Sequence, residues 1–138
     1  MKVQKYRGVN ALALVRIIVG LLILNHGLML FNTEKMQEFM TFLEKLYVPF
    51  PLMMAYVSKG TEFLGGVLLI CGLFTRWVSA PLVINMLVAL RAHTWQITGE
   101  GEHAFLFLLL FMVFLLVGGG KFSLDHLLFA KEQRIYRY

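Results

Sequence analysis

Four long apolar segments limit the fold of this 138-residue chain more than any other feature. They cover residues 11–31, 52–74, 77–95 and 103–119, and a helix needs about 20 mostly apolar residues to cross a bilayer. The segments do not alternate apolar and polar residues as the strands of a membrane barrel do. The sequence therefore predicts an all-α protein, an antiparallel four-helix transmembrane bundle that forms a single membrane domain over residues 1–138.

The composition excludes the other common classes of protein. At 59% hydrophobic and 15% charged residues, the chain is far more apolar than soluble domains or disordered chains. The net charge of +5 comes from basic residues that flank the apolar segments, so no nucleic-acid partner is predicted. The single Cys71 excludes an intramolecular disulfide. The first segment is too long for a cleaved signal peptide and is predicted to be retained.

Basic residues are distributed unequally between the two sides of this bundle. One side holds at most three, Lys35, Lys45 and Arg91, and the other holds eight: Lys2, Lys5, Arg7, Arg76, Lys121, Lys131, Arg134 and Arg137. Short loops rich in Lys and Arg stay in the cytoplasm. Both termini are therefore predicted to be cytoplasmic, in the inner membrane of a bacterium or archaeon, with membrane lipid as a partner.

Two further helices are predicted at the membrane surfaces. Between residues 32 and 51, apolar residues recur at helical spacing and polar residues fill the opposite face. This pattern predicts an outer interfacial amphipathic helix that ends before Pro49 and Pro51. The helix is either a passive tether or a lid over a lateral entrance. A short C-terminal surface helix is predicted over residues 124–132, after the glycines at 118–120 end the fourth span.

Ionisable residues inside the apolar segments form the candidate site. A helix rises about 1.5 Å per residue, and this rise places polar residues of all four segments in one layer of the outer half of the membrane: His26, Lys59, Glu62, Arg91, His93, Glu102 and His103. Ionisable groups in a span are costly, so each needs a partner or a function. Each also has a structural explanation, such as a Lys59–Glu62 ion pair one turn apart. Asn85 is expected to form an interhelical hydrogen bond.

Helical phase indicates which of these residues face protein. At about 100° per residue, one face of the second segment carries Ala55, Ser58, Glu62, Gly65, Gly66 and Leu69. Small residues let helices approach closely in lipid, so this face is predicted to point into the bundle. On the first segment, a similar face carries Arg16, Gly20, Ile23 and Gly27. Arg16 either lies in the bundle or snorkels to the lipid headgroups.

Three kinds of chemistry fit this polar layer. Lys, Arg and His side chains can donate hydrogen bonds to the carbonyl oxygens of a quinone-like molecule, with Glu62 exchanging protons. A metal site is the second, but the sequence lacks a His-x-x-x-His pair, so none is predicted. The third is proton-coupled transport driven by Glu62, for which so short a chain needs to form a homo-oligomer.

Several stretches of the chain, read in order, share the motifs of one family of small membrane proteins. Arg16 with His26-Gly27 is similar to the Arg…His-Gly stretch of the family. Residues 62–66 and 72–76 are similar to Glu-x-x-Gly-Gly and Gly-Leu-x-Thr-Arg, and residues 118–125 to the closing Gly-x-Gly-x-x-Ser-Leu-Asp. With these motifs the chain resembles the DoxX family of small four-helix membrane proteins, and the resemblance covers nearly the whole chain. It implies a membrane protein associated with redox chemistry, often a quinone-linked subunit or a partner of sulfur and oxidative-stress enzymes.

The leading hypothesis is a redox-linked membrane subunit that binds a quinone-like molecule in this layer. Glu62 is the predicted catalytic residue, exchanging protons, and the predicted ligand contacts are His26, Lys59, Arg91, His93, Glu102 and His103. Arg16, Arg76 and Asp125 are predicted to be structural, with Arg76 paired to Asp125. Without a recognisable cofactor motif, the chain is predicted to be an oxidoreductase subunit that depends on a redox partner protein. The alternatives are a non-catalytic assembly or anchoring subunit and, third, a small transporter.

Overall fold

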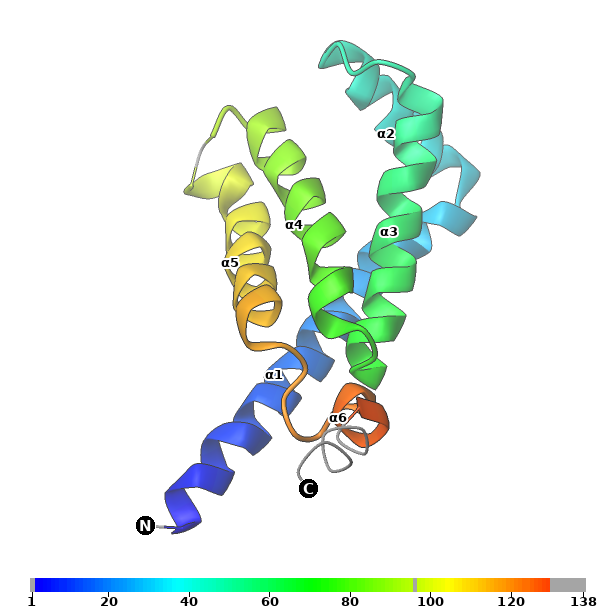
Figure 1. The fold of residues 1–138 in the computed structure, drawn as a ribbon. Helices are drawn as coiled ribbons and strands as arrows, with labels where there is room; N and C mark the ends of the chain where they lie inside the picture. The colour runs from blue at the N-terminus through cyan, green and yellow to red at the C-terminus, as the bar shows by residue number, and fades with distance from the viewer. Residues whose placement is uncertain (1, 96, 130–138) are drawn as a thin grey trace.

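The computed structural model describes residues 2–95 and 97–129, with only the backbone described for residues 2–10. Its elements are α1 (Lys2–Gly27), the short helix η1 (Leu28–Phe31), α2 (Thr33–Lys45), α3 (Pro51–Cys71), α4 (Thr75–Ala92), the short helix η2 (Gly99–Gly101), α5 (Glu102–Val117) and α6 (Leu124–Phe129). Within these ranges the chain forms helices and no strand (Figure 1), which confirms the predicted all-α class.

Three segments are long and apolar enough to cross a membrane. They are Ala11–Phe31, Pro51–Cys71 and Gly99–Val117, and they correspond to the first, second and fourth predicted spans. The third predicted span corresponds to α4, which is not among the three segments that are long and apolar enough to cross a membrane. α4 has 18 residues and carries Arg76 in its first turn and Arg91 in its last.

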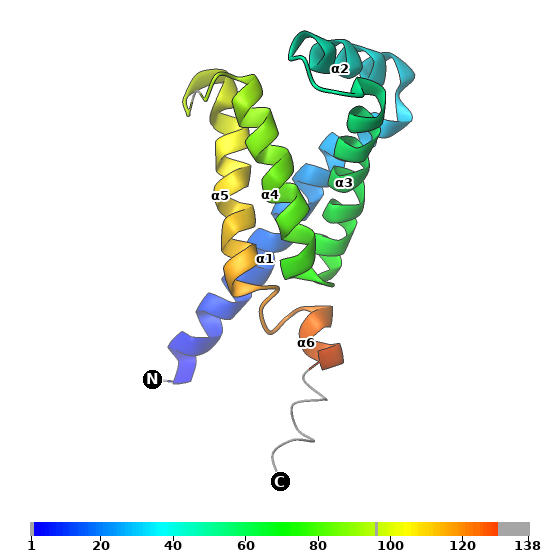
Figure 2. The same ribbon diagram turned by 45° about the horizontal axis from the view of Figure 1, so that its top comes forward.

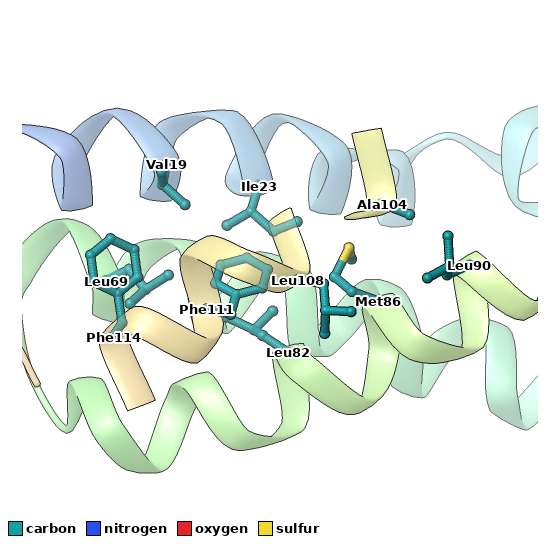
Figure 3. Close-up of a cluster of buried hydrophobic side chains, with 10 residues drawn as sticks. All are labelled: Val19, Ile23, Leu69, Leu82, Met86, Leu90, Ala104, Leu108, Phe111 and Phe114. Carbon is teal, nitrogen blue, oxygen red and sulfur yellow. The ribbon is translucent and has the colours of Figure 1, made fainter. Parts of the chain in front are cut away.

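The helices are arranged as two pairs. α1 packs along α3, and α4 packs along α5, while α3 meets α4 over a shorter length. Figures 1 and 2 show α2 and α6 at opposite ends of the molecule. Side chains from all four long helices form a buried cluster (Figure 3): Val19, Ile23, Leu69, Leu82, Met86, Leu90, Ala104, Leu108, Phe111 and Phe114. In lipid, helices associate because their side chains pack closely, and exclusion of water contributes little.

Glycines bring the backbones of α1 and α3 close together. A Cβ atom added at Gly27 would lie 2.3 Å from the backbone N of Phe63, and one at Gly66 would lie 2.7 Å from the backbone N of Leu24. The buried residues of α3 are Ala55, Lys59, Glu62, Gly65, Gly66 and Leu69. This is the predicted inward face, except that Ser58 is only half-buried and Lys59 is buried as well. The predicted inward face of α1 is also buried.

α2 is the amphipathic helix predicted after the first span. The side chain of Asn32 caps it by accepting a hydrogen bond from the Lys35 N–H at 3.0 Å. Its apolar face contains Met36 and Leu43, which are buried and pack in one cluster with Ala55 of α3. The helix ends before the two prolines that follow it, as expected. α2 therefore lies against one end of α3 with its polar face exposed.

Asp125 holds the start of α4 to the start of α6. Its Oδ1 accepts a hydrogen bond from the Phe74 N–H at 2.6 Å, and its Oδ2 accepts one from the Thr75 N–H at 2.9 Å. The N–H of Asp125 in turn donates to the carbonyl oxygen of Gly72 at 3.0 Å. The first turn of a helix has unpaired N–H groups and a positive dipole end, so a carboxylate is stabilised there.

The predicted pairing of Arg76 with Asp125 is replaced by other contacts. Arg76 Nη2 donates to the carbonyl oxygen of Leu116, near the end of α5, at 3.1 Å. Both oxygens of Asp125 already accept hydrogen bonds from the backbone of the α3–α4 turn. Arg76 therefore joins α4 to the end of α5, and Asp125 joins α6 to the α3–α4 turn, at the same end of the protein. The surface helix predicted over 124–132 is observed as α6, and its last three predicted residues lie outside the described residues.

Arg16 connects α1 to the segment after α5. Its side chain is 2% exposed, and its guanidinium donates to the carbonyl oxygens of Gly119 and Phe122, the latter at 2.9 Å. A Cβ atom at Gly72 would lie 2.6 Å from the guanidinium carbon, so only glycine leaves room for it. Arg16 thus binds protein carbonyl groups inside the bundle rather than the headgroups.

The capping by Asp125 has a measurable consequence. We expect Asp125→Ala to lower the free energy of unfolding by about 1–2 kcal/mol, because the N–H groups of Phe74 and Thr75 at the start of α4 lose their acceptor. Asp125→Asn keeps one oxygen acceptor and should lose less. Reversible unfolding in mixed detergent micelles measures both, with Glu38→Ala on the exposed face of α2 as the control. An Asp125→Ala variant as stable as the control would contradict the capping role.

Candidate functional site

The candidate site is centred on an ion pair within α3. Lys59 and Glu62 are one helical turn apart and only 6% and 5% exposed. Lys59 Nζ lies 2.8 Å from Glu62 Oε2. Buried charges are costly unless they are paired and hydrogen-bonded, so this pair keeps a spanning helix electrically neutral while holding two ionisable groups inside it.

Asn85 of α4 and Ser58 of α3 complete the hydrogen bonding of the pair. Asn85 Nδ2 donates to Glu62 Oε1 at 3.0 Å, and Ser58 Oγ donates to Asn85 Oδ1 at 2.8 Å. Both oxygens of Glu62 are therefore paired, one with Lys59 and one with Asn85. We call these four residues the buried polar network. It confirms the expected interhelical hydrogen bond of Asn85, whose partner the sequence did not identify.

α2 covers the network from one side. The Nζ of Lys59 lies 4.6 Å from the centre of the Phe39 ring, which is a cation–π contact. A small cavity of about 110 Å³ lies between α2 and α3, and its walls include Met36, Met40 and Ala55. Ala55 is one turn before Lys59 on α3. The cavity therefore lies close to the network along α3, and α2 covers the cavity.

The other predicted site residues lie apart from this network. His26 is exposed, and its ring lies edge-on to that of Phe107 at 5.9 Å. His93 Nδ1 lies 3.7 Å from Glu100 Oε2, in the connection between α4 and α5. The remaining three are exposed: Arg91, Glu102 and His103. Among the described residues, no hydrogen bond or ion pair joins any of these five to the buried polar network.

The buried polar network offers hydrogen-bonding groups rather than a set of metal ligands. Within the described part of the chain, no group of three or more His, Cys, Asp and Glu residues could hold a metal ion. The network instead offers an ammonium donor, a carboxylate and an amide in a water-poor environment. An ammonium group carries three N–H bonds, and Lys59 donates one of them to Glu62. Such a group can donate to a carbonyl oxygen while the carboxylate exchanges a proton.

Comparisons with known proteins place the chain among membrane proteins of one family. The DoxX family model matches residues 11–95, a range that contains the whole buried polar network and Phe39. An "Uncharacterized protein" of Haemophilus influenzae is 33% identical over 136 residues, covering 93% of this chain and 97% of that protein. No solved structure shows a significant match.

Proposed function

Because this chain belongs to the DoxX family and has apolar spanning helices, it is an integral membrane protein, and we propose that it binds a quinone-like molecule as a redox-linked subunit. The observation that carries this proposal is the buried polar network. Lys59 is the proposed donor to a quinone carbonyl oxygen, and Glu62 the proposed proton-exchanging residue. The electrons come from a separate redox partner, because the sequence contains no cofactor motif.

The proposed orientation follows from the charge distribution. α4 is the proposed fourth span, because it packs along the spanning helix α5. With both termini in the cytoplasm of a bacterial or archaeal inner membrane, the end that carries α6 faces the cytoplasm and α2 lies at the outer surface. The network then lies in the outer half of the membrane, where a lipid-soluble molecule reaches it laterally. The whole chain forms one membrane domain.

The cavity beneath α2 is the proposed route of entry. Its volume of about 110 Å³ is smaller than the roughly 150 Å³ of an engineered cavity that binds benzene, so a quinone ring has to widen it. A quinone head group entering there displaces Phe39 from Lys59 and takes its place against the ammonium group. α2 is thus a lid rather than a tether in this proposal. His26, Arg91, His93, Glu102 and His103 have no part in it, because no bond joins them to the network.

A second candidate function is supported by the completeness of the network. Both oxygens of Glu62 are already hydrogen-bonded, which also suits a non-catalytic assembly or anchoring subunit whose polar residues only fix α3 against α4. The two functions differ in their response to a conservative change. Glu62→Gln keeps the size of the side chain and one oxygen acceptor, but it replaces the other acceptor with an NH2 donor and removes the charge and the ability to exchange a proton.

The test is a calorimetric titration of the purified protein in mild detergent with a short-chain ubiquinone analogue. We expect the wild type to bind it and Glu62→Gln to bind at least about tenfold more weakly, because the Lys59 ammonium loses its counter-ion and the arrangement of donors changes. Glu34→Gln, on the exposed first turn of α2, is the matched control. Equal binding by wild type and Glu62→Gln, or none by either, would favour the anchoring function.

A further inference from the structure

A second cavity lies at the end of the helices that carries α6, away from α2 and from the buried polar network (Figure 1). It has a volume of about 590 Å³ and is formed where α4 begins, α5 ends and α6 follows. Its walls include Arg76, Trp77, Lys121, Asp125 and His126. We call it the α6-side cleft. Its volume is in the range of about 300–1,000 Å³ that small-molecule sites occupy, and the proposed quinone site does not use it.

The charged groups of this cleft favour an anion. Arg76, Lys121 and His126 line the cleft together with one carboxylate, that of Asp125. The Asp125 oxygens accept hydrogen bonds from the N–H groups of Phe74 and Thr75, so its charge is already offset by the first turn of α4. Arg76 donates one N–H to the carbonyl of Leu116, and a guanidinium has five. Among the described residues, the cleft therefore holds the permanent cations Arg76 and Lys121 against one carboxylate, which backbone N–H groups already bind.

The surroundings of the cleft are those of a membrane interface. Trp77 is 81% exposed, and exposed tryptophans are typical of the boundary between hydrocarbon and headgroups. Large apolar side chains are also exposed around it, at Leu116 on α5 and at Leu127 and Leu128 on α6. The spanning segment that includes α5 ends at Val117, one residue before the cleft-lining Gly118. The cleft thus adjoins the end of a spanning segment, where the phosphate groups of a bilayer are expected, beside an apolar surface suited to acyl chains.

From this combination we propose that the α6-side cleft binds the phosphate headgroup of an anionic phospholipid. Arg76 and Lys121 bind the phosphate, for which the planar guanidinium of arginine is especially suited. The acyl chains lie along the exposed apolar surface of α4 and α5. Basic pockets beside membrane helices attract anionic lipids in this way. A lipid held there joins the α3–α4 turn to the segment after α5, next to the contacts made by Arg16 and Asp125.

Native mass spectrometry of the full-length protein tests this proposal, with phosphatidylglycerol and phosphatidylcholine added in equal amounts to mild detergent. We expect wild type to retain phosphatidylglycerol preferentially. Lys121→Gln should bind it about fivefold more weakly, and the double variant Arg76→Gln/Lys121→Gln about 25-fold, because each cation near a membrane surface contributes a similar increment. Phosphatidylcholine binding should stay unchanged. Lys35→Gln, on the exposed face of α2, is the matched control.

Two results would overturn the proposal. One is a Lys121→Gln variant that retains phosphatidylglycerol as well as wild type and Lys35→Gln do. The other is displacement of phosphatidylglycerol by millimolar inorganic phosphate, which would assign the cleft to a soluble phosphate compound. The Lys121 side chain is exposed, so Lys121→Gln gives a decisive result even if loss of the Arg76 contact unfolds the double variant. Quinone binding is measured separately, and its failure leaves this test unchanged.

Discussion

Replacing Glu62 by leucine is expected to lower the free energy of unfolding by about 3–5 kcal/mol, because the buried Lys59 ammonium group loses its counter-ion. Lys59→Met should be destabilising for the matching reason, with the Glu62 carboxylate left unpaired. Both side chains are nearly fully buried and only 2.8 Å apart, so little water is available to replace the missing partner. Reversible unfolding in mixed detergent micelles measures each variant.

The double variant Lys59→Met/Glu62→Leu separates the cost of an unpaired charge from the value of the pair. Replacing a whole buried ion pair by apolar residues of similar size is often neutral or stabilising. Here Asn85 loses the acceptor of its 3.0 Å hydrogen bond, which costs about 1 kcal/mol. We therefore expect the double variant to be within about 2 kcal/mol of wild type. A double variant less stable than both single variants would show that the pair is needed for folding.

Gly27→Ala is the second change with a large expected effect. Its Cβ atom would lie 2.3 Å and 2.5 Å from the backbone N and Cα of Phe63. These are backbone atoms of a neighbouring helix, so α1 and α3 must separate. Overpacking of a close interface costs about 1–3 kcal/mol and sometimes more, and we expect the upper end of this range because no flexible side chain can move away.

The matched control for this change is Gly60→Ala on the same pair of helices. A Cβ atom at Gly60 has no atom within 4 Å, and alanine inside a helix is more stable than glycine by about 0.5–1 kcal/mol. Gly60→Ala should therefore be slightly stabilising in the same unfolding measurement. A Gly27→Ala variant as stable as Gly60→Ala would contradict the close contact between the backbones of α1 and α3. Because the added atom also lies 2.8 Å from the carbonyl carbon of Glu62, Gly27→Ala should weaken quinone binding as well.

The sequence predicted the helices well because their signals are local. Apolar length identified the three segments that are long and apolar enough to cross a membrane, and the periodicity after Asn32 identified α2 with its end before the prolines. Helical phase also placed Glu62 on the buried face of α3, since the small residues around it mark the close contact with α1. Each of these inferences depends only on residues within one helix.

The site was harder to predict because it depends on contacts between helices. Rise along each helix placed seven ionisable residues at one height, but height does not give direction. Arg91 is six residues after Asn85, which turns it to a different face of α4, and it is exposed. The contact of Phe39 with Lys59 depends on how α2 folds back over α3. Asp125 likewise caps a turn 50 residues earlier in the sequence, which no local pattern indicates.

Native mass spectrometry with lipid extraction tests the quinone proposal most directly, applied to wild type and to Lys59→Met/Glu62→Leu purified from membranes in mild detergent. The double variant is chosen because it is expected to keep the fold while losing the charged groups of the network. We predict a stoichiometric quinone bound to wild type and none bound to the double variant. Equal quinone on both proteins, or only phospholipid on a folded wild type, would contradict the assignment of the buried polar network as a quinone site.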